Sequence, residues 1–402
     1  MNRASDGTEI FDVVVVGGGP AGATAAHELA QGGRSVLLLD RSGRTKPCGG
    51  AIPPRLIRDF GIPDDLLVAK ITSARMISPK SENVDIPIEN GFVGMVDREA
   101  FDPWLRERAV ASGADLRSGT FKLFSRDGDG VARIHYRPGA DPDAGAVHSV
   151  RARAVIGADG ATSEVAKQTI KGAERMRYVF AYHEIVRSPT VPHAAFDAQR
   201  CDVIYRGELS PDFYSWVFPH GATTSIGTGS ARKGFSLRTA VSALRGASQL
   251  DGETIRREGA PIPMKPLPRW DNGRDVVLAG DAAGVVAPAS GEGIYYAMVG
   301  GQFAAQAVEA LLVTGDVRSL KLARKKFMKL HGLVFWVLGI MQRFWYSSEG
   351  RRERFVSICK DPDVQKLTFE AYMNKELVRR KPMAHVRIFF KDLAHLLGLA
   401  PA

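Results

Sequence analysis

The sequence predicts an α/β fold in which a discontinuous parallel-sheet domain carries an inserted, mostly β domain and a helical C-terminal region. Two runs of branched apolar residues lead into glycines, as buried parallel strands do: "FDVVVV" (Phe11–Val16) and "RDVVLAGDAAG" (Arg274–Gly284). Between them, residues 179–266 alternate apolar and polar positions and contain many aromatic residues, which is typical of a half-buried sheet. After Gly291 the apolar spacing becomes helical. This order places a strand-rich insertion between two halves of one parallel sheet.

A β-α-β unit begins the first domain. The strand at Phe11–Val16 is followed by an expected helix at Ala21–Gln31 and a second strand at Arg34–Arg41. The short connections between these segments are typical of parallel strands joined by a crossover helix.

Three further elements extend this domain. Arg98–Gly113 has the apolar spacing of a helix, the Asp and Gly residues of Ser125–Gly130 indicate a hairpin turn, and Arg151–Gly160 is a third buried strand. We therefore expect the domains to divide as follows: the parallel-sheet domain at 1–75, 97–178 and 267–320, the β domain at 76–96 and 179–266, and the C-terminal region at 321–402.

The cysteines and the N-terminus indicate a cytoplasmic protein. Cys48, Cys201 and Cys359 are an odd number at wide spacing, which predicts neither a disulfide framework nor a metal site. The first ten residues are polar and lack the basic start and apolar run of a secretion signal.

The positive charge is confined to the C-terminal region. The chain has a net charge of +10, and residues 321–402 alone contain 17 Lys and Arg against 7 Asp and Glu, so the remainder is balanced and nucleic-acid binding is not expected. The apolar run "GLVFWVLGIMQRFWY" (Gly332–Tyr346) is shorter than the roughly 20 residues needed to span a bilayer. Its basic flanks favour peripheral contact with an anionic membrane, and a buried helix or a partner interface fits the same pattern.

The first strand leads into a dinucleotide-binding motif. Gly17, Gly19 and Gly22 form G-x-G-x-x-G between strand and helix, where they allow a tight turn, a close approach of pyrophosphate and close helix packing. Pro20 and Ala21 lie where the expected helix starts, and the N-terminus of that helix would face the phosphates. Asp40 ends the next strand, where its carboxylate is placed to bind ribose hydroxyls, and Arg41 follows it.

Two later motifs resemble those of the aromatic-hydroxylase-like flavoproteins, which bind FAD. They are "GADG" (Gly157–Gly160) and "AGDAAG" (Ala279–Gly284), each at the end of a strand. The resemblance implies that FAD is the cofactor and that "PASGEG" (Pro288–Gly293) brings backbone N–H groups to the flavin ring. The cofactor-binding residues it implies beyond the first motif are Arg98, Asp159, Gly160, Gly280, Asp281, Pro288, Gly291 and Gly293, although Arg98 also fits a surface residue at a helix start.

Two segments point to one family within these flavoproteins. "YSWVFPHGATTSIGTG" (Tyr214–Gly229) and "KPCGGAIPPR" (Lys46–Arg55) are similar to the signatures of geranylgeranyl reductases, and stretches including "FWYSSEGRRERF" resemble their (bacterio)chlorophyll branch over essentially the whole chain. This implies stepwise reduction of isolated C=C bonds, three of the four in a geranylgeranyl chain, carried by bacteriochlorophyll or by free diphosphate. NADPH is the implied electron donor and reduced ferredoxin the alternative. A peripheral position on the photosynthetic membrane is also implied, and the oligomeric state is left open.

The candidate substrate residues have two interpretations, and Cys48 has three. Tyr214, Trp216 and Phe218, with Pro219 fixing the strand end, would line an apolar slot for isoprene units, or would pack the sheet onto its core. Cys48 would donate a proton to the substrate, would alter the environment of the flavin, or would be only a small, weakly polar side chain beside the flavin ring.

Gly49 and Gly50 would let the backbone of the Cys48 loop approach the flavin or flex as it moves. Three competing functions remain open at this point: a flavin monooxygenase, an archaeal-type isoprenoid lipid reductase, and a pigment-binding protein that keeps FAD for structure.

Overall fold

The computed structural model describes residues 2–3, 9–41, 45–89, 91–141, 143, 145–191, 193–365, 373 and 375. The chain divides into two compact units. Unit 1 comprises Met1–Lys46, Glu99–Tyr178 and Pro261–Phe335, and unit 2 comprises Pro47–Arg98, Val179–Ala260 and Trp336–Ala402. Both units are discontinuous in sequence, and each is described by itself.

Unit 1 is built on a seven-stranded sheet with the order β1-β2-β3-β9-β10-β11-β17 and a further pairing of β2 with β11. Within it, β3, β2, β11 and β17 run parallel; the last residues of β2, β11 and β17 are in register, and β3 extends one residue further. Their sequences are nearly continuous apolar runs because both faces are covered. The strand bounds are β1 Asn2–Arg3, β2 Glu9–Val16, β3 Val36–Asp40, β9 Asp115–Arg126, β10 Ala132–Pro138, β11 His148–Gly157 and β17 Val276–Leu278.

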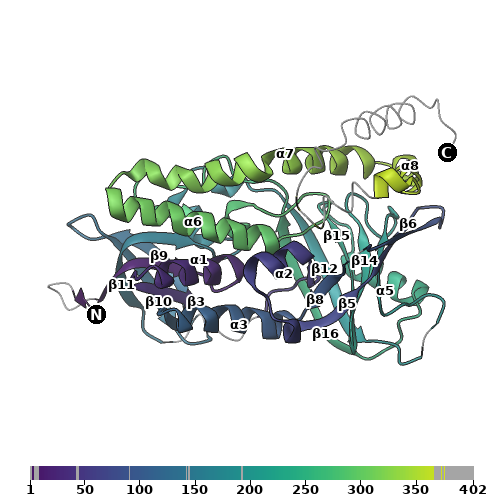
Figure 1. Cartoon of the computed structure of the whole chain (residues 1–402), viewed down its shortest axis with the longest axis horizontal. Coiled ribbons are helices and arrows are strands. Elements are labelled where there is room, and N and C mark those ends of the chain that lie inside the picture. Colours follow the sequence, from purple (N-terminus) through teal and green to yellow (C-terminus); the bar gives the residue numbers. More distant parts are fainter. Residues whose placement is uncertain are drawn as a thin grey trace. The chain divides into compact units, whose positions relative to one another are not determined.

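Helices α1 (Pro20–Gln31) and α6 (Ile294–Thr314) pack together in unit 1 (Figure 1). A Cβ on Gly301 of α6 would overlap the carbonyl oxygen of Ala21, so glycine permits the close approach of the two helices. Among the described residues, α6 is the one helix long and apolar enough to cross a membrane, but a core helix passes the same test and most of α6 is buried. Unit 1 also contains α4 Glu164–Thr169, η2 Ala173–Arg175, η3 Gly280–Ala283, η4 Val317–Leu320 and all but the first residue of α3 Arg98–Ala111, and the helix that follows η4 belongs to unit 1 as far as Phe335.

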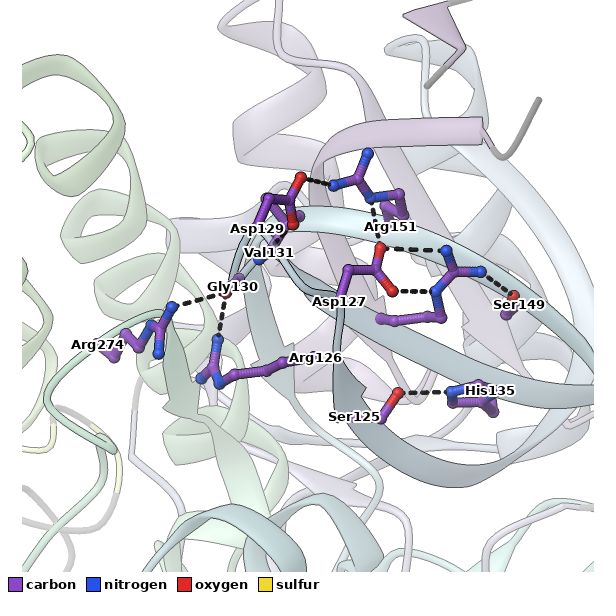
Figure 2. Close-up of polar contacts among 11 residues, drawn as sticks. Ser125, Arg126, Asp127, Asp129, Gly130, Val131, His135, Ser149, Arg151 and Arg274 are labelled. Atoms are coloured by element: carbon purple, nitrogen blue, oxygen red, sulfur yellow. Dashed lines mark hydrogen bonds and ion pairs between the residues drawn. The ribbon is translucent and has the colours of Figure 1, made fainter. Parts of the chain in front are cut away.

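A network of ion pairs ties the β9–β10 hairpin to its neighbours at the amino end of β17 (Figure 2). Arg126 pairs with Asp275 at 2.7 Å, and Arg151 pairs with Asp127 at 2.7 Å. Gly130 at the turn accepts a hydrogen bond from Arg126 at 3.2 Å. Because β11 and β17 are parallel, this network lies at the opposite edge of the sheet from the strand ends that carry the glycine motifs.

Unit 2 contains a second seven-stranded sheet, of order β16-β12-β15-β14-β13-β6-β7. Helix α5 (Leu237–Ala247) covers one face through a core that includes Val217, Ile226 and Val241. A three-stranded sheet, β4-β8-β5, and helix α2 (Pro54–Phe60) complete this part. The bounds of the remaining elements are β4 Ala51–Ile52, η1 Asp64–Leu66, β5 Leu67–Ile71, β6 Ser73–Ile77, β7 Asn83–Pro87, β8 Val93–Val96, β12 Tyr178–Arg187, β13 Arg200–Ile204, β14 Ser215–His220, β15 Thr223–Ser230 and β16 Thr254–Pro263.

Two helices follow η4, namely α7 (Lys321–Trp345) and α8 (Glu349–Ile358). Arg352 of α8 is 2% exposed, and its guanidinium donates to the carbonyls of Tyr346 at 2.6 Å and of Pro211. Glu349 accepts from Arg352 at 2.6 Å and from the Gly207 N–H at 2.9 Å. The segment "SSEGRRERF" therefore holds the loop that leads into β14.

The α/β class, the discontinuous nucleotide-type domain, the inserted β domain and the helical C-terminal region are confirmed. The expected first helix begins one residue earlier, because Pro20 fits the first helical position. The first unit boundary falls at Lys46, whereas the sequence placed a domain boundary at residue 75, since α2 and the β4-β8-β5 sheet belong to unit 2. The domain limits proposed from the sequence stay a prediction, and most of the expected C-terminal region beyond residue 365 lies outside the described residues.

Candidate functional site

The glycine and aspartate motifs of unit 1 meet at one edge of its sheet. The Gly17 N–H donates to the Leu39 carbonyl at 2.7 Å, and the Ala158 N–H donates to the Val16 carbonyl at 2.8 Å. The Ala279 N–H donates to the Gly157 carbonyl at 2.9 Å. The loops that follow β2, β3, β11 and β17 are thus neighbours at the carboxyl ends of parallel strands, which is where open α/β sheets bind ligands.

The three glycines of the first motif have three different surroundings. Gly17 has φ +102°, and a Cβ on it would overlap the Ala158 carbonyl. A Cβ on Gly22 would overlap the Gly17 carbonyl, so this glycine lets α1 pack against the strand end. A Cβ on Gly19 would meet nothing within 4 Å. The chain is therefore crowded behind Gly17 and Gly22 and open in front of Gly19, as close approach of a pyrophosphate requires.

Asp40 is oriented by two groups that flank the first motif. Its Oδ1 accepts from the Gly18 N–H at 2.8 Å, and its Oδ2 lies 3.2 Å from the Arg106 guanidinium. Arg106 also donates to the Gly18 carbonyl at 3.4 Å. Arg41 follows directly and is partly exposed. Arg106 had not been identified from the sequence, because its link to Asp40 spans two elements.

Asp281 is nearly buried and forms an ion pair with Lys46. The preceding Gly280 has φ +62°, and a Cβ on it would lie 2.7 Å from the Ala21 side chain. Lys46 also went unnoticed in the sequence, although it begins the "KPCGGAIPPR" segment. The pair fixes a carboxylate and an ammonium group at the end of β17.

The carboxylate of Asp159 is engaged by the chain itself. Its Oδ2 accepts from the N–H groups of Glu164 at 2.7 Å and Val165 at 3.1 Å, and its Oδ1 accepts from the Ser163 hydroxyl. These bonds satisfy the N-terminus of α4. What this motif offers to a ligand is therefore backbone, at Asp159 and at Gly160, whose φ is +87°.

The loop Pro288–Gly293 runs into the N-terminus of α6. Pro288 is buried, and Gly291, with φ +66°, donates its N–H to the Ala287 carbonyl at 2.9 Å. Gly293 is the N-cap residue and supplies no side-chain cap. Arg98, the first residue of α3, is buried rather than on the surface.

The aromatic candidate substrate residues of unit 2 lie in β14 and directly before it. The rings of Tyr214 and Phe218 lie 6.0 and 6.2 Å from the ring of Trp216, measured between centroids. Tyr214 and Trp216 are buried, Phe218 is partly exposed, and Pro219 is buried within the strand. The packing interpretation therefore describes much of Tyr214 and Trp216, while Phe218 retains an accessible ring.

The G-x-G part of the same signature makes room for these rings. A Cβ on Gly227 would overlap the indole of Trp216 and lie 2.6 Å from the Cβ of His183, and a Cβ on Gly229 would lie 2.8 Å from the ring of Phe213. Both glycines are on β15, which pairs with β14. The signature is thus a packing requirement of unit 2.

A buried polar chain continues from Trp216. Its indole N–H donates to the Ser225 hydroxyl at 3.1 Å, and that hydroxyl lies 2.9 Å from His183 Nδ1. His183 Nε2 lies 3.1 Å from the Glu258 carboxylate, and this contact lowers the pKa of Glu258. This series of hydrogen bonds fixes the orientation of the Trp216 indole through its N–H group.

Cys48 lies in a loop that packs on the end of β14. The Gly50 N–H donates to the Cys48 sulfur at 3.4 Å, and a Cβ on Gly49 would lie 3.3 Å from the ring of Phe218. Cys48 is a free, partly exposed thiol, whereas Cys201 and Cys359 are buried. Burial raises the pKa of the Cys201 thiol. Cysteine chemistry at neutral pH is therefore concentrated at Cys48.

In the part of the chain that the structure describes, no group of three or more His, Cys, Asp or Glu side chains is placed to hold a metal ion.

Comparisons with known proteins agree with these features. Residues 10–315 match the model of a protein family described as FAD binding domain. The geranylgeranyl diphosphate reductase of Rhodobacter capsulatus is 59% identical over 97% of this chain and 98% of its own length. A chloroplastic geranylgeranyl diphosphate reductase of rice (Oryza sativa subsp. japonica) is 35% identical over 96% of this chain and 86% of its own. Among solved structures, a geranylgeranyl bacteriochlorophyll reductase-like protein of Thermoplasma acidophilum shares the fold, with a TM-score of 0.79 at 22% identity over 94% of this chain and 99% of that one.

Proposed function

This chain belongs to the geranylgeranyl diphosphate reductases, within the FAD-binding flavoproteins, and we propose that it reduces isolated C=C bonds of geranylgeranyl chains to give the phytyl form. It is an FAD-dependent oxidoreductase that acts on CH–CH groups. The observation that carries the proposal is the gathering of four motif loops at one sheet edge, in a chain 59% identical to a reductase of that name. A monooxygenase activity is not favoured, and neither is lipid reduction.

The residues of unit 1 fit FAD. Gly19 and the N-terminus of α1 would receive the pyrophosphate, and Asp40 would bind ribose hydroxyls while Gly18 and Arg106 hold its orientation. The backbone at Asp159 and Gly160, and the Asp281–Lys46 pair, would complete the cradle. When bound and reduced, FAD supplies a hydride for one alkene carbon.

The residues of unit 2 would bind the isoprenoid. An unpolarised alkene has no carbonyl to activate, so its reduction depends on an apolar, water-poor surface and a positioned proton donor. The partly exposed ring of Phe218, backed by Trp216 and Tyr214, offers such a surface. The Cys48 thiol beside it would give its proton to the second alkene carbon and regain one from solvent.

The activity is tested with purified full-length protein, dithionite and no oxygen. Geranylgeranyl diphosphate and geranylgeranyl bacteriochlorophyll a are supplied in parallel, and products are weighed by mass spectrometry. Stepwise gains of two hydrogens are expected, and the faster substrate identifies the natural form. No gain with either substrate contradicts the proposal, and a gain of one oxygen in air would point to a monooxygenase.

Cys48 is tested by Cys48→Ala, with Cys201→Ala as the control at a buried thiol. Loss of turnover with FAD still bound is expected for Cys48→Ala alone. Full activity would make Cys48 a small wall residue.

We propose NADPH as the electron donor, with reduced ferredoxin as the alternative. The rate of flavin bleaching under anaerobic conditions, measured with each donor, decides between them. Bleaching by ferredoxin alone would overturn the NADPH assignment.

We also propose that α7 docks on the surface of an anionic, photosynthetic membrane. Leu330, Leu333, Trp336 and Ile340 are spaced as one helical face and are each about half exposed or more, at 52%, 53%, 64% and 47%. No acidic residue lies between Lys321 and Trp345, and the Lys and Arg residues of the helix flank this face, five of them at Lys321–Lys329 and one at Arg343. Leu333→Gln with Trp336→Gln should abolish partition into phosphatidylglycerol vesicles, whereas unchanged partition would exclude this face.

A further inference from the structure

His220 occupies the end of the strand that carries the aromatic residues. It is the last residue of β14, and its side chain turns back on the Cys48 loop, within unit 2. Its Nδ1 lies 2.9 Å from the carbonyl oxygen of Phe218. The backbone of Gly49 also hydrogen-bonds to the ring and raises its pKa, as an acceptor does. The imidazole therefore bridges the strand and the loop.

The loop is shaped to receive this ring. Gly50 has φ +70°, and a Cβ on it would overlap His220 Nε2 and lie 2.6 Å from the Val96 carbonyl. From the other side, the Val96 N–H donates to the Gly50 carbonyl at 2.9 Å. Gly50 in turn donates its N–H to the Cys48 sulfur at 3.4 Å. The Cys48 loop is thus held by β8 on one side and by His220 on the other.

The surroundings of His220 shift its pKa in opposite directions. Burial is the largest effect and lowers the pKa of His220, the nearby His183 lowers it further, and Asp97 raises it. Asp97 is itself 3.8 Å from Arg256, which also pairs with Glu258 at 3.3 Å. A neutral imidazole at pH 7 has one N–H, which it can donate to the carbonyl of Phe218 or of Gly49 but not to both at once. The ring therefore ties the strand to the loop by one hydrogen bond and by its packing against Gly50, not by a fixed charge.

We propose that His220 is a positioning residue, which ties the Cys48–Gly49–Gly50 loop to the end of β14 and so sets the place of the Cys48 thiol beside Phe218. It acts through the loop backbone and does not itself contact the substrate. The effect on turnover rests on the proposed role of Cys48, whereas the effect on the thiol does not.

The direct test is the rate at which Cys48 is alkylated by iodoacetamide in the full-length protein with FAD bound, followed by peptide mass mapping. In His220→Asn the amide nitrogen replaces Nδ1 but cannot reach the loop, whereas in His220→Gln it approximates Nε2. We expect alkylation to accelerate about three- to tenfold in His220→Asn, as for the loss of one hydrogen bond, and less in His220→Gln. His135→Asn is the matched control, because His135 bonds to Ser125 at 2.7 Å in the β9–β10 hairpin of unit 1.

The buried thiols Cys201 and Cys359 report unfolding in the same experiment. If these buried thiols react in His220→Asn, that variant is partly unfolded. The alkylation rate of Cys48 is then compared between His220→Gln and wild type, at a temperature at which Cys201 and Cys359 do not react in either protein. Rates at Cys48 within twofold of wild type in the folded variants would overturn the proposal.

Turnover separates this proposal from the proposed function. A fall in kcat of His220→Asn with unchanged KM for geranylgeranyl diphosphate is expected if Cys48 donates the proton. Faster alkylation with normal kcat would keep His220 as a positioning residue and remove Cys48 from the reaction. A wild-type protein that fails to reduce geranylgeranyl chains would overturn the proposed function, while the alkylation rates would still decide the role of His220.

Discussion

Replacing Gly19 with alanine should separate cofactor binding from folding. Gly19 has φ −75° and ψ −175°, which alanine adopts without strain, and its Cβ would meet nothing within 4 Å. The FAD-free protein should therefore keep its stability or gain about 0.4–1 kcal/mol from the stiffer unfolded chain. FAD should bind more weakly, because the new methyl group fills the space proposed for the pyrophosphate.

The size of the loss follows from the clash. A phosphate oxygen that bonds to the backbone near Gly19 comes to about 3 Å, which leaves no room for a methyl group. Relieving such an overlap costs about 1–3 kcal/mol, which corresponds to about a 5- to 150-fold rise in Kd. In Gly22→Ala the clash lies within the chain, at the Gly17 carbonyl, so this variant should lose about 1–3 kcal/mol of folding stability even without FAD.

The assay titrates apoprotein with FAD by fluorescence quenching and records thermal unfolding with and without FAD. Gly246→Ala in α5 is the control, since its Cβ would also meet nothing within 4 Å, so it should stabilise the fold without changing the Kd. Wild-type affinity in Gly19→Ala would refute the placement of the pyrophosphate at this loop.

Three further predictions concern unit 2. Gly227→Ala should raise KM for geranylgeranyl diphosphate and cost about 1–3 kcal/mol in calorimetry, because its Cβ displaces the indole of Trp216; an unchanged KM would contradict an isoprenoid surface there. Arg352→Met should cost about 1.5–3 kcal/mol in urea unfolding through the lost buried hydrogen bonds, whereas the exposed Arg351→Met should not, and equal effects would show that burial of the guanidinium is immaterial. The fold lowers the pKa of His220, so as the pH falls the unfolded chain binds this proton before the folded protein does. The neutral His220 therefore contributes its full stability above about pH 6.5, and this contribution is lost as the pH falls toward the pKa of the folded state. The free energy of unfolding should change by at most about 1.4 kcal/mol per pH unit from this group. Thermal unfolding from pH 7.5 to 5 should show a smaller slope in His220→Asn, and identical slopes would exclude this effect.

The sequence predicts best the strands in which successive residues are buried, because such strands are continuous apolar runs. Strands β2, β3, β11 and β17 are covered on both faces, so each is an apolar run, and glycine-rich segments mark the ends of β2, β11 and β17. Strand β4 has two residues, and β5 and β8 are short, so they leave little periodic signal. This is why residues 47–75 were placed with the nucleotide domain although they belong to unit 2.

The parts of the site that escaped sequence analysis are pairs that meet only in three dimensions. Lys46 and Asp281 are 235 residues apart, and Arg106 reaches Asp40 from a different element. The tie between His220 and the Cys48 loop likewise joins a strand end to a distant turn. Each partner alone has an ordinary surface or packing interpretation, so composition and spacing carry no signal for the pair.

The glycines of the motifs show a related limit, because one residue type serves opposite purposes. At the sheet edge of unit 1, a Cβ on Gly17, Gly22 or Gly280 would strike the chain, whereas a Cβ on Gly19 or Gly160 would meet nothing within 4 Å. The first group is required by packing, so its substitution is felt in the empty protein. In the second group, Gly160 still needs glycine for its φ of +87°, whereas Gly19 has φ −75° and is required by nothing in the chain. A glycine that the chain does not need, beside glycines that it does, marks the side from which the ligand approaches, and at this sheet edge that glycine is Gly19.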